Sequence, residues 1–455
     1  MSDFAELSIA GRIATPSDPD WDEARAAWNL IADQNPEAVA LVESAEDVAA
    51  TVRFAVQHDM RIAGQGTGHG AAPLGSLEGT ILIKTERMRG IEVDPSARTA
   101  RIEAGVLSAE LGIAASEHGL SALPGSSPDV GTVGYTLGGG MSWLVRAHGF
   151  ACNHVRAIEL VTADGEARTV DGENDPDLFW ALRGGGGGYA IVTALQLDLL
   201  PIADLYAGTL AFPAAVGGEA VRTYRDWAAD LPDEVTSIVR FVTPPPIPDV
   251  PEPIRGVPLL TIGAACIGDQ ASGEATIAPL RASLDSPIMD IFEQMPAAGL
   301  SHIHMDPENP VPGIGGGVPI TALPDEAIDA FTAAAGPDSG SPLLLSELRH
   351  LGGAVGRPAE NGGALSHLDA GFVMYSVGMP MTPELGEAIR GHLRHLEETM
   401  TPWTADGGYF NLTERPCDVD EILPAEVCSR LAEVKRRYDP NGMIVANHAV
   451  AIGPA

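Results

Sequence analysis

The chain has 455 residues, of which 45% are hydrophobic and 20% are charged, and its formal net charge is −35 at pH 7. This length exceeds what one simple hydrophobic core organises, so at least two domains are expected, and the hydrophobic content excludes a largely disordered protein. The strong negative charge excludes general affinity for nucleic acid or for an anionic membrane.

The sequence also indicates the cellular location of the protein and whether it binds a metal. No apolar run approaches the roughly 20 residues that span a bilayer, and the start Met-Ser-Asp-Phe-Ala-Glu lacks the basic residues of a signal peptide, so no membrane association and a cytoplasmic location are expected. Cys152, Cys266, Cys417 and Cys428 lie far apart without a Cys-x-x-Cys pair. Neither a disulfide framework nor a zinc site is indicated, and no metal is predicted.

In chain order, the first informative segment covers residues 36–48. It predicts a strand followed by a helix, with Ser44 as the helix cap and Asp47 as a shorter substitute for the capping-box glutamate. The next segment is Arg61-Ile-Ala-Gly-Gln-Gly-Thr-Gly-His-Gly70. Its alternate glycines free the backbone amides to point at one centre, as in an anion nest for a pyrophosphate, and His69 suggests a reactive cofactor edge nearby. The spacing fits neither the Rossmann fingerprint nor the Walker loop.

Further glycine clusters follow in the same half of the chain. A strand-rich unit begins at residues 98–105 and extends to about residue 203. Within it, glycine-rich segments at 123–131, 136–144 and 182–192 alternate with apolar runs.

The composition then changes. The proline-rich segments 243–253 and 310–319 predict extended loops, because proline does not fit a central strand. Residues 258–266 and 370–377 have the alternation of strands, and residues 325–331 and 383–393 have the periodicity of helices. This mixture predicts an antiparallel sheet with helices on one face.

The chain resembles the berberine-bridge-enzyme-like branch of the FAD-linked oxidases, within the vanillyl-alcohol-oxidase or PCMH-type flavoprotein superfamily. The resemblance rests on the glycine clusters, on their order and on the C-terminal segment Tyr438-Asp-Pro-Asn-Gly-Met-Ile-Val-Ala-Asn-His448. The resemblance extends from Trp21 to the end of the chain. It implies an α+β fold with a two-part PCMH-type FAD-binding domain at 1–203 and an α/β substrate-binding domain with an antiparallel sheet at 204–408. Residues 409–455 would return to the FAD domain.

The resemblance also implies a cofactor, FAD, covalently attached through His69. The other residues expected around FAD are Gly64, Gln65, Gly66, Thr67, Gly68, Gly70, Gly125, Ser126, Ser127, Val130, Gly131, Gly134, Tyr135, Gly139, Gly140, Asn153, Val155, Val192, Asn411 and Asn447. Ser127 stands where many relatives carry a second flavin-linked cysteine, and a hydroxyl cannot replace that thiolate. A single covalent bond is therefore expected, without participation of Cys152.

Two positions bear on the reaction that the resemblance implies. Val130 occupies the place where a small residue admits oxygen to the flavin, which favours an oxidase over a dehydrogenase. Leu412 occupies the place of a tyrosine that serves as base in relatives, and it cannot take a proton.

The base must therefore come from elsewhere. The candidates are Tyr409, Tyr375, Glu347, His367 and the pair His302 and His304. Tyr409 is expected on the same side of a strand as Asn411. The two histidines would share one strand face, and a structural or substrate-contact role is favoured over a metal site because no third ligand is evident.

Three functions remain open. The first is an FAD-dependent oxidase that takes a hydride from a small or medium-sized alcohol, amine or activated carbon and passes the electrons to O2, giving H2O2, in specialised metabolism. The second is a cyclase or oxygenase of a natural-product pathway on the same fold. The third is a flavin-binding or carbohydrate-binding protein without turnover. The expected partners are a small-molecule substrate and O2, and the chain would be a monomer or a homodimer.

Overall fold

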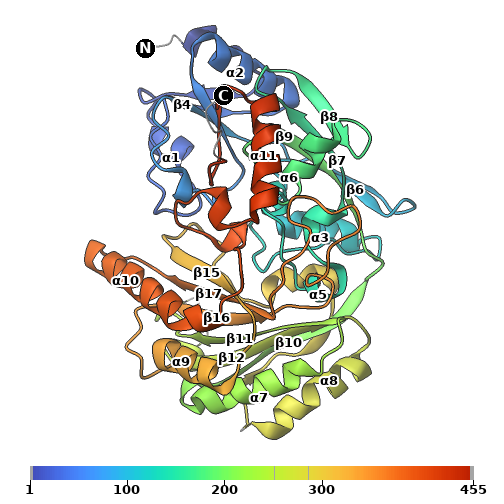
Figure 1. The fold of residues 1–455 in the computed structure, drawn as a ribbon, viewed down its shortest axis with the longest axis vertical. Coiled ribbons are helices and arrows are strands. Elements are labelled where there is room, and N and C mark those ends of the chain that lie inside the picture. Colours follow the sequence, from blue (N-terminus) through green and yellow to red (C-terminus); the bar gives the residue numbers. More distant parts are fainter. Residues whose placement is uncertain (1–3, 249, 251, 285, 451–455) are drawn as a thin grey trace.

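Three β-sheets organise the molecule, with two five-stranded sheets in the upper half of Figure 1 and an eight-stranded sheet in the lower half. The computed structural model describes residues 4–248, 250, 252–284 and 286–450. Helices and mainly antiparallel sheets share the chain, which confirms the predicted α+β class.

The first sheet is mostly parallel and carries the glycine-rich loop at the end of one strand. Its strands are β1 (Arg12–Ala14), β2 (Ala38–Leu41), β3 (Arg61–Gln65), β4 (Thr80–Lys84) and β18 (Ile444–Val445), in the order β1-β2-β4-β3-β18. Only β1 is antiparallel to its neighbour among these described strands. Its helices are α1 (Trp21–Arg25) and α2 (Ala45–Gln57), with 3-10 helices at Phe4–Glu6 and Ala72–Leu74. Every residue of β2 and β4 is buried, as expected for a parallel sheet covered on both faces.

The start of α2 differs in one detail from the prediction. The Ser44 hydroxyl accepts a hydrogen bond from the Asp47 amide at 3.2 Å, so the predicted cap is correct. The Asp47 carboxylate, however, accepts from the amides of Glu43, Ala10 and Gly11 and does not return to Ser44. Asp47 thus fastens the N-terminal segment to α2, because its short side chain lies closer to those amides.

The second sheet is antiparallel. Its strands are β5 (Ile91–Asp94), β6 (Thr99–Glu103), β7 (Val155–Val161), β8 (Ala167–Asp171) and β9 (Ile191–Asp198), in the order β5-β6-β9-β7-β8. The helices of this unit are α3 (Ser108–Ser116), α4 (Thr132–Leu137), α5 (Val145–His148) and α6 (Pro176–Leu182), with a 3-10 helix at Ala151–His154. The loops around α4 and after α6 contain the second and third glycine clusters.

The eight-stranded sheet is antiparallel and has helices on one face, seen below it in Figure 1. Its strands are β10 (Asp204–Pro213), β11 (Val235–Val242), β12 (Leu259–Cys266), β13 (Met289–Asp290), β14 (Glu293–Pro296), β15 (Ile314–Ile320), β16 (Leu345–His350) and β17 (Phe372–Gly378). The helices are α7 (Gly217–Ala229), α8 (Gln270–Ser283), α9 (Asp325–Ala335) and α10 (Pro383–Met400), with 3-10 helices at Ala214–Val216, Glu252–Ile254, Ala297–His302 and Thr401–Trp403.

Alternation along these strands divides the sheet into two faces. Leu348, Met374 and Phe241 belong to the apolar core shared with the helices. The register places Arg240 opposite Glu347, and Glu347 opposite Tyr375, in one row across β11, β16 and β17. Because neighbours across a sheet share a face, this polar row lies on the side away from the helices.

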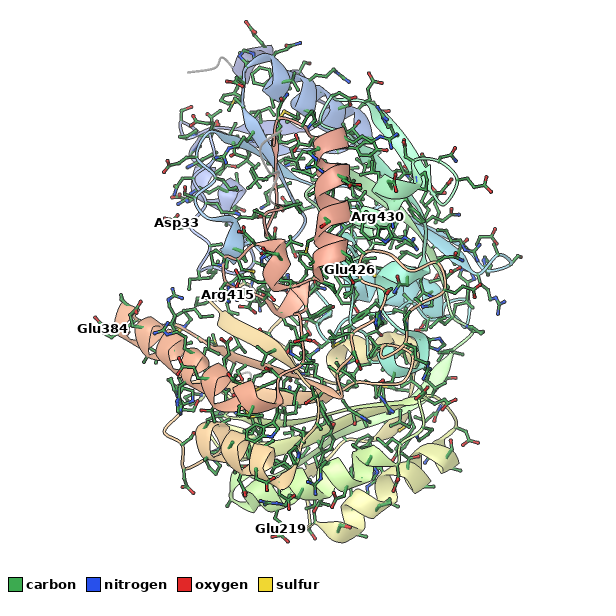
Figure 2. The ribbon with its side chains drawn as sticks, in the orientation of Figure 1. Asp33, Glu219, Glu384, Arg415, Glu426 and Arg430 are labelled. Atoms are coloured by element: carbon green, nitrogen blue, oxygen red, sulfur yellow. The ribbon has the colours of Figure 1, made fainter. Side chains whose placement is uncertain are left out.

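The last part of the chain returns to the upper half. It contains 3-10 helices at Phe410–Leu412 and Val419–Glu421, then α11 (Ala425–Tyr438) and β18, which pairs with β3. Arg430 of α11, labelled in Figure 2, forms an ion pair with Asp177 of α6 at 2.9 Å and lies 3.9 Å from the centre of the Trp180 ring. These contacts hold α11 beside α6.

Three local expectations were wrong. The predicted loop at 310–319 is a strand from residue 314 onward, within β15, whose position at the sheet edge tolerates Pro319 because the outer side needs no amide donor. His302 ends a 3-10 helix and His304 lies in the turn after it, so the two do not share a strand face. Tyr409 precedes a 3-10 helix that contains Asn411, so this segment is not a strand either.

Candidate active site

A cavity of about 470 Å³ lies between the glycine-rich loops and the polar face of the eight-stranded sheet. The loop after β3, the segment around α4, the glycines after α6 and the residues around β18 form one side. Residues from 304–313, 344–349, 375–379 and 409–414 form the other side. Segments distant in sequence therefore meet at one site.

Most of the expected cofactor residues line this cavity. They are Gly64, Gln65, Gly66, Thr67, Gly68, His69, Gly70, Gly125, Ser126, Ser127, Val130, Gly131, Gly134, Tyr135, Val192, Asn411 and Asn447.

Four others lie outside its wall. Gly139 and Gly140 adopt φ values of 117° and 81° in the turn after α4. The Asn153 amide donates to the carbonyls of Leu365 and Ser366, and Val155 is buried in the core. Of these four, Gly139 and Gly140 lie against wall residues, because a Cβ at these positions would come within 2.9 Å of Tyr409 and 2.8 Å of Tyr135.

The loop after β3 requires glycine where it passes close to other backbone. Gly68 has φ +89°, and a Cβ there would lie 2.8 Å from the Cβ of Ala27. Neither the backbone conformation nor the space suits a side chain. The loop therefore brings bare backbone to the cavity, as an anion nest requires.

Several polar atoms in the cavity wall are available to a ligand. Both amide atoms of Gln65, the Nε2 atom of His69 and the hydroxyl of Tyr135 are buried and have no hydrogen-bond partner in the described residues. Buried polar atoms without partners are costly, so a ligand with donors and acceptors would stabilise them. The wall thus fits a large polar cofactor with a phosphate-bearing part.

His69 is held on three sides. Its Nδ1 atom lies 2.7 Å from the Thr67 hydroxyl, its ring stacks on Trp28 with a centroid distance of 3.9 Å, and its Nε2 atom lies 3.5 Å from Asp129. Burial alone would raise the pKa of Asp129, but contacts with His69, Trp28 and Ser127 lower it. Asp129 is therefore an ionised carboxylate beside the imidazole. Trp28 and Asp129 were missed by sequence reasoning, since no local motif joins positions 101 residues apart.

Cys152 lies away from the cavity wall. Its side chain is fully buried, its sulfur lies 3.5 Å from the Leu365 carbonyl oxygen, and burial raises the pKa of its thiol to about 12. A thiol with so high a pKa is a poor nucleophile. Ser127, by contrast, lines the cavity and donates to Asp129 at 3.2 Å.

The candidate bases occupy different environments. Tyr375, Tyr409 and His304 line the cavity, whereas His367 contacts Ser366 at 2.9 Å outside it. Tyr409 is buried, stacks on Phe150 and accepts a hydrogen bond from Asn411 at 3.1 Å. Burial raises the pKa of Tyr409 and of Tyr375, so both phenols are neutral at neutral pH.

Glu347 belongs to a buried charge network. Its carboxylate contacts Arg349 and lies 2.8 Å from His304 Nε2, while His304 Nδ1 lies 2.6 Å from Asp306. Burial alone would raise the pKa of Glu347, but Arg349, His304 and Arg240 lower it strongly. Glu347 is fully buried and remains ionised, so it orients its neighbours and is a weak proton acceptor.

Removal of Arg349 tests this network. Arg349→Ala should lower the free energy of unfolding by roughly 3–5 kcal/mol, because Glu347 would keep a buried charge without its main partner. The lost stability should be largest above the unfolded pKa of a glutamate, about 4.3, and should shrink as acid protonates Glu347. Urea unfolding at several pH values measures both.

The matched control is Arg357→Ala. Arg357 is 65% exposed in its ion pair with Asp233, so its loss should cost about 1 kcal/mol or less. An Arg349→Ala protein as stable as the Arg357→Ala protein would contradict the role given to the network.

Glu414 is a further cavity residue that sequence reasoning missed. One carboxylate oxygen accepts from the Tyr375 hydroxyl at 2.6 Å, and the other accepts from the Gly315 amide at 2.9 Å. Burial raises the pKa of Glu414. The only sequence signal was its position two residues after Leu412, and its partners come from β15 and β17.

Two negative findings apply to the described part of the chain. No group of three or more histidine, cysteine, aspartate or glutamate side chains there has the arrangement of a metal site. No helix there has both the length and the apolar character needed to cross a membrane.

Comparisons with known proteins agree with this geometry. A family model described as an FAD binding domain matches residues 36–171. The (R)-6-hydroxynicotine oxidase of Paenarthrobacter nicotinovorans is 27% identical over 460 residues, which cover 98% of this chain and 97% of that protein.

Solved structures resemble the whole chain. The 6-hydroxy-D-nicotine oxidase of Arthrobacter nicotinovorans superposes with a TM-score of 0.82 at 25% identity, covering 98% of both chains. The wild-type BBE-like 1 protein of Physcomitrella patens superposes with a TM-score of 0.86 at 19% identity, also covering 98% of both chains. The second likeness concerns the fold alone.

Proposed function

We propose that this chain, an FAD-linked oxidoreductase of the berberine-bridge-enzyme-like flavoproteins, is an oxidase that transfers a hydride from a small organic substrate to FAD and electrons onward to O2, giving H2O2. The observation that carries the proposal is the cavity itself. It joins a glycine-lined cofactor side, with His69, to a polar side with Tyr375 and Glu414. Such a site would place a cofactor and a substrate next to each other.

The chain's own residues would hold FAD from several directions. The backbone around Gly66 and Gly68 would face the pyrophosphate, and the unpartnered amide of Gln65 and hydroxyl of Tyr135 would meet polar ring or ribityl atoms. When bound, FAD supplies a two-electron acceptor for the hydride. The residues at 304–313 and 375–379 would then cover the substrate from the sheet side.

The proposal includes a single covalent bond between His69 and FAD. Support comes from the buried Nε2 atom of His69, which lies 3.5 Å from Asp129 but forms no well-aligned hydrogen bond with the described residues, and from the stack on Trp28 that fixes the ring plane. The location of Cys152 outside the cavity wall and the hydroxyl of Ser127 support a single link.

Val130 lines the cavity, so its size should control how easily oxygen reaches the flavin. Val130→Leu should slow reoxidation of the photoreduced enzyme by roughly tenfold, because the larger side chain would narrow the approach to the flavin; tenfold corresponds to ~1.4 kcal/mol in the barrier. Stopped-flow mixing with aerated buffer measures the rate, and reduction by substrate should stay nearly unchanged. Slow reoxidation of the unchanged enzyme together with fast reduction of a dye would instead identify a dehydrogenase.

A substrate screen tests the function as a whole. Amines, alcohols and sugars are added to the yellow enzyme without oxygen, and a substrate should bleach the flavin absorbance. Air should then restore the colour and yield one H2O2 for each substrate oxidised. Bleaching and product formation without peroxide would favour the cyclase or oxygenase alternative, for which the loss of the usual phenol at Leu412 in the cavity wall is the supporting observation.

A further inference from the structure

Glu414 stands apart from the other buried or partly buried acids beside the cavity. Glu347 contacts Arg349 and His304, and Asp306 contacts His304, so each has a basic partner. The two hydrogen bonds to Glu414 come from neutral donors, the Tyr375 hydroxyl and the Gly315 amide. Among the described residues, no lysine, arginine or histidine nitrogen forms an ion pair with it.

The neighbours of Glu414 leave room for its carboxylate and donate hydrogen bonds to it. Gly315 lies on the edge strand β15, and a Cβ there would lie 2.9 Å from the Glu414 oxygen and 2.8 Å from the Tyr375 hydroxyl. Glycine at this position therefore leaves room for the pair and lets its own amide reach the carboxylate. The two donors fix the direction of the carboxylate at the cavity wall.

Apolar side chains occupy much of the same cavity wall. They include Val311, Pro312, Leu344, Val377, Met379 and Leu412, while Arg349 in that wall pairs with Glu347. A carboxylate that has only neutral hydrogen-bond donors among the described residues is poorly compensated unless a cation approaches it, and burial accordingly raises the pKa of Glu414. A ligand with an ammonium group and an apolar body would supply the missing charge and cover the apolar wall.

We infer that Glu414, held by Tyr375 and Gly315, is a binding site for the cationic nitrogen of an amine substrate with an apolar body. This inference rests on the proposed function, because it selects amines from the wider class of alcohols, amines and activated carbons. Glu414 would recognise the positive charge of the amine, and the surrounding cavity wall would recognise the shape of its apolar body.

Isothermal titration calorimetry of the flavin-loaded enzyme at pH 7.5, without oxygen, tests the inference with two probes. Benzylamine is a cation at this pH, and benzyl alcohol has the same ring and arm without the charge. The unchanged enzyme should bind benzylamine roughly 10- to 100-fold more tightly than benzyl alcohol, the range expected for a hydrogen bond to a charged group. Glu414→Gln should abolish this preference and leave the affinity for benzyl alcohol within about twofold.

The matched control is Glu397→Gln. Glu397 is a half-buried acid of α10 that lies near Gly316 but outside the cavity wall, so the same change of carboxylate to amide there should keep the preference. If Glu414→Gln does not fold, Glu414→Ala, which also removes the charge, serves in its place and should likewise abolish the preference. Circular dichroism checks the fold of each variant.

Several results would overturn the inference. They are equal binding of the two probes by the unchanged enzyme, no binding of benzylamine, retention of the preference in folded Glu414→Gln or Glu414→Ala, or loss of the preference in Glu397→Gln. Failure of the proposed function is recognised separately, because a missing flavin shows in the absorbance spectrum and missing peroxide shows in the substrate screen. Neither readout depends on the calorimetric comparison.

Discussion

His69→Ala protein should lose all acid-stable flavin while still binding FAD reversibly. The imidazole is the proposed point of attachment, whereas the glycine-rich backbone and the Gln65 amide that would hold the cofactor remain in place. After precipitation with acid, the unchanged enzyme should give a yellow pellet and the variant a colourless pellet with yellow supernatant. Absorbance of both fractions measures the result.

Cys152→Ser is the control for this experiment. Cys152 is buried behind the cavity wall with a thiol pKa of about 12, so its replacement should leave the acid-stable flavin intact. If His69→Ala protein retained yellow colour in the pellet, another residue would have to carry the link. If that colour disappeared only when Cys152→Ser was added to His69→Ala, the flavin would have two attachment points, in conflict with the single bond proposed from Ser127.

Tyr375→Phe should lower the rate of flavin reduction by about 10²–10⁴-fold, the contribution typical of a positioned acid or base. The substrate's N–H or O–H proton would pass to the Tyr375 oxygen as Tyr375 gives its own proton to Glu414 at 2.6 Å. A neutral phenol can act in this way, and the raised pKa of Glu414 suits it to accept the proton. Anaerobic stopped-flow reduction across pH, with the substrate that bleaches the flavin, measures the rate.

Tyr409→Phe is the matched comparison. Tyr409 also lines the cavity, but its hydroxyl accepts from Asn411, and no carboxylate among the described residues accepts a hydrogen bond from it. The rate should therefore fall by less than about tenfold with the same pH profile. A large loss of rate in Tyr409→Phe with a small loss in Tyr375→Phe would identify Tyr409 as the base. A small loss in both variants would leave the histidines on the substrate side of the cavity as the candidate bases.

Local patterns account for much of what was predicted correctly. The alternation at residues 258–266 and 370–377 predicted the strands observed as β12 and β17. The periodicity at residues 325–331 and 383–393 predicted the helices observed as α9 and α10. These elements bury one face, which leaves a regular pattern in the sequence. The loop predicted at 310–319 was wrong from residue 314 onward, because an edge strand accepts glycine and proline that a central strand excludes.

The active-site partners were harder to predict for a different reason. Trp28 meets His69 and Asp129, and Glu414 meets Tyr375 and Gly315, through contacts between segments far apart in the chain. Such contacts depend on the register of the sheets and on how the last segment returns, and neither leaves a local motif. The glycine-rich loop was recognisable because its glycines are required by its own backbone conformation.

The peptide of residues 62–84 provides the most direct test of the cofactor site. Trypsin cleaves after Arg61 and after Lys84, so this single peptide contains the whole glycine-rich loop with His69. Mass spectrometry of the digested, acid-precipitated enzyme should show it with the added mass of FAD, and fragmentation should place the addition on His69. A fully unmodified 62–84 peptide, with all flavin released by acid, would contradict the covalent site on which the account depends.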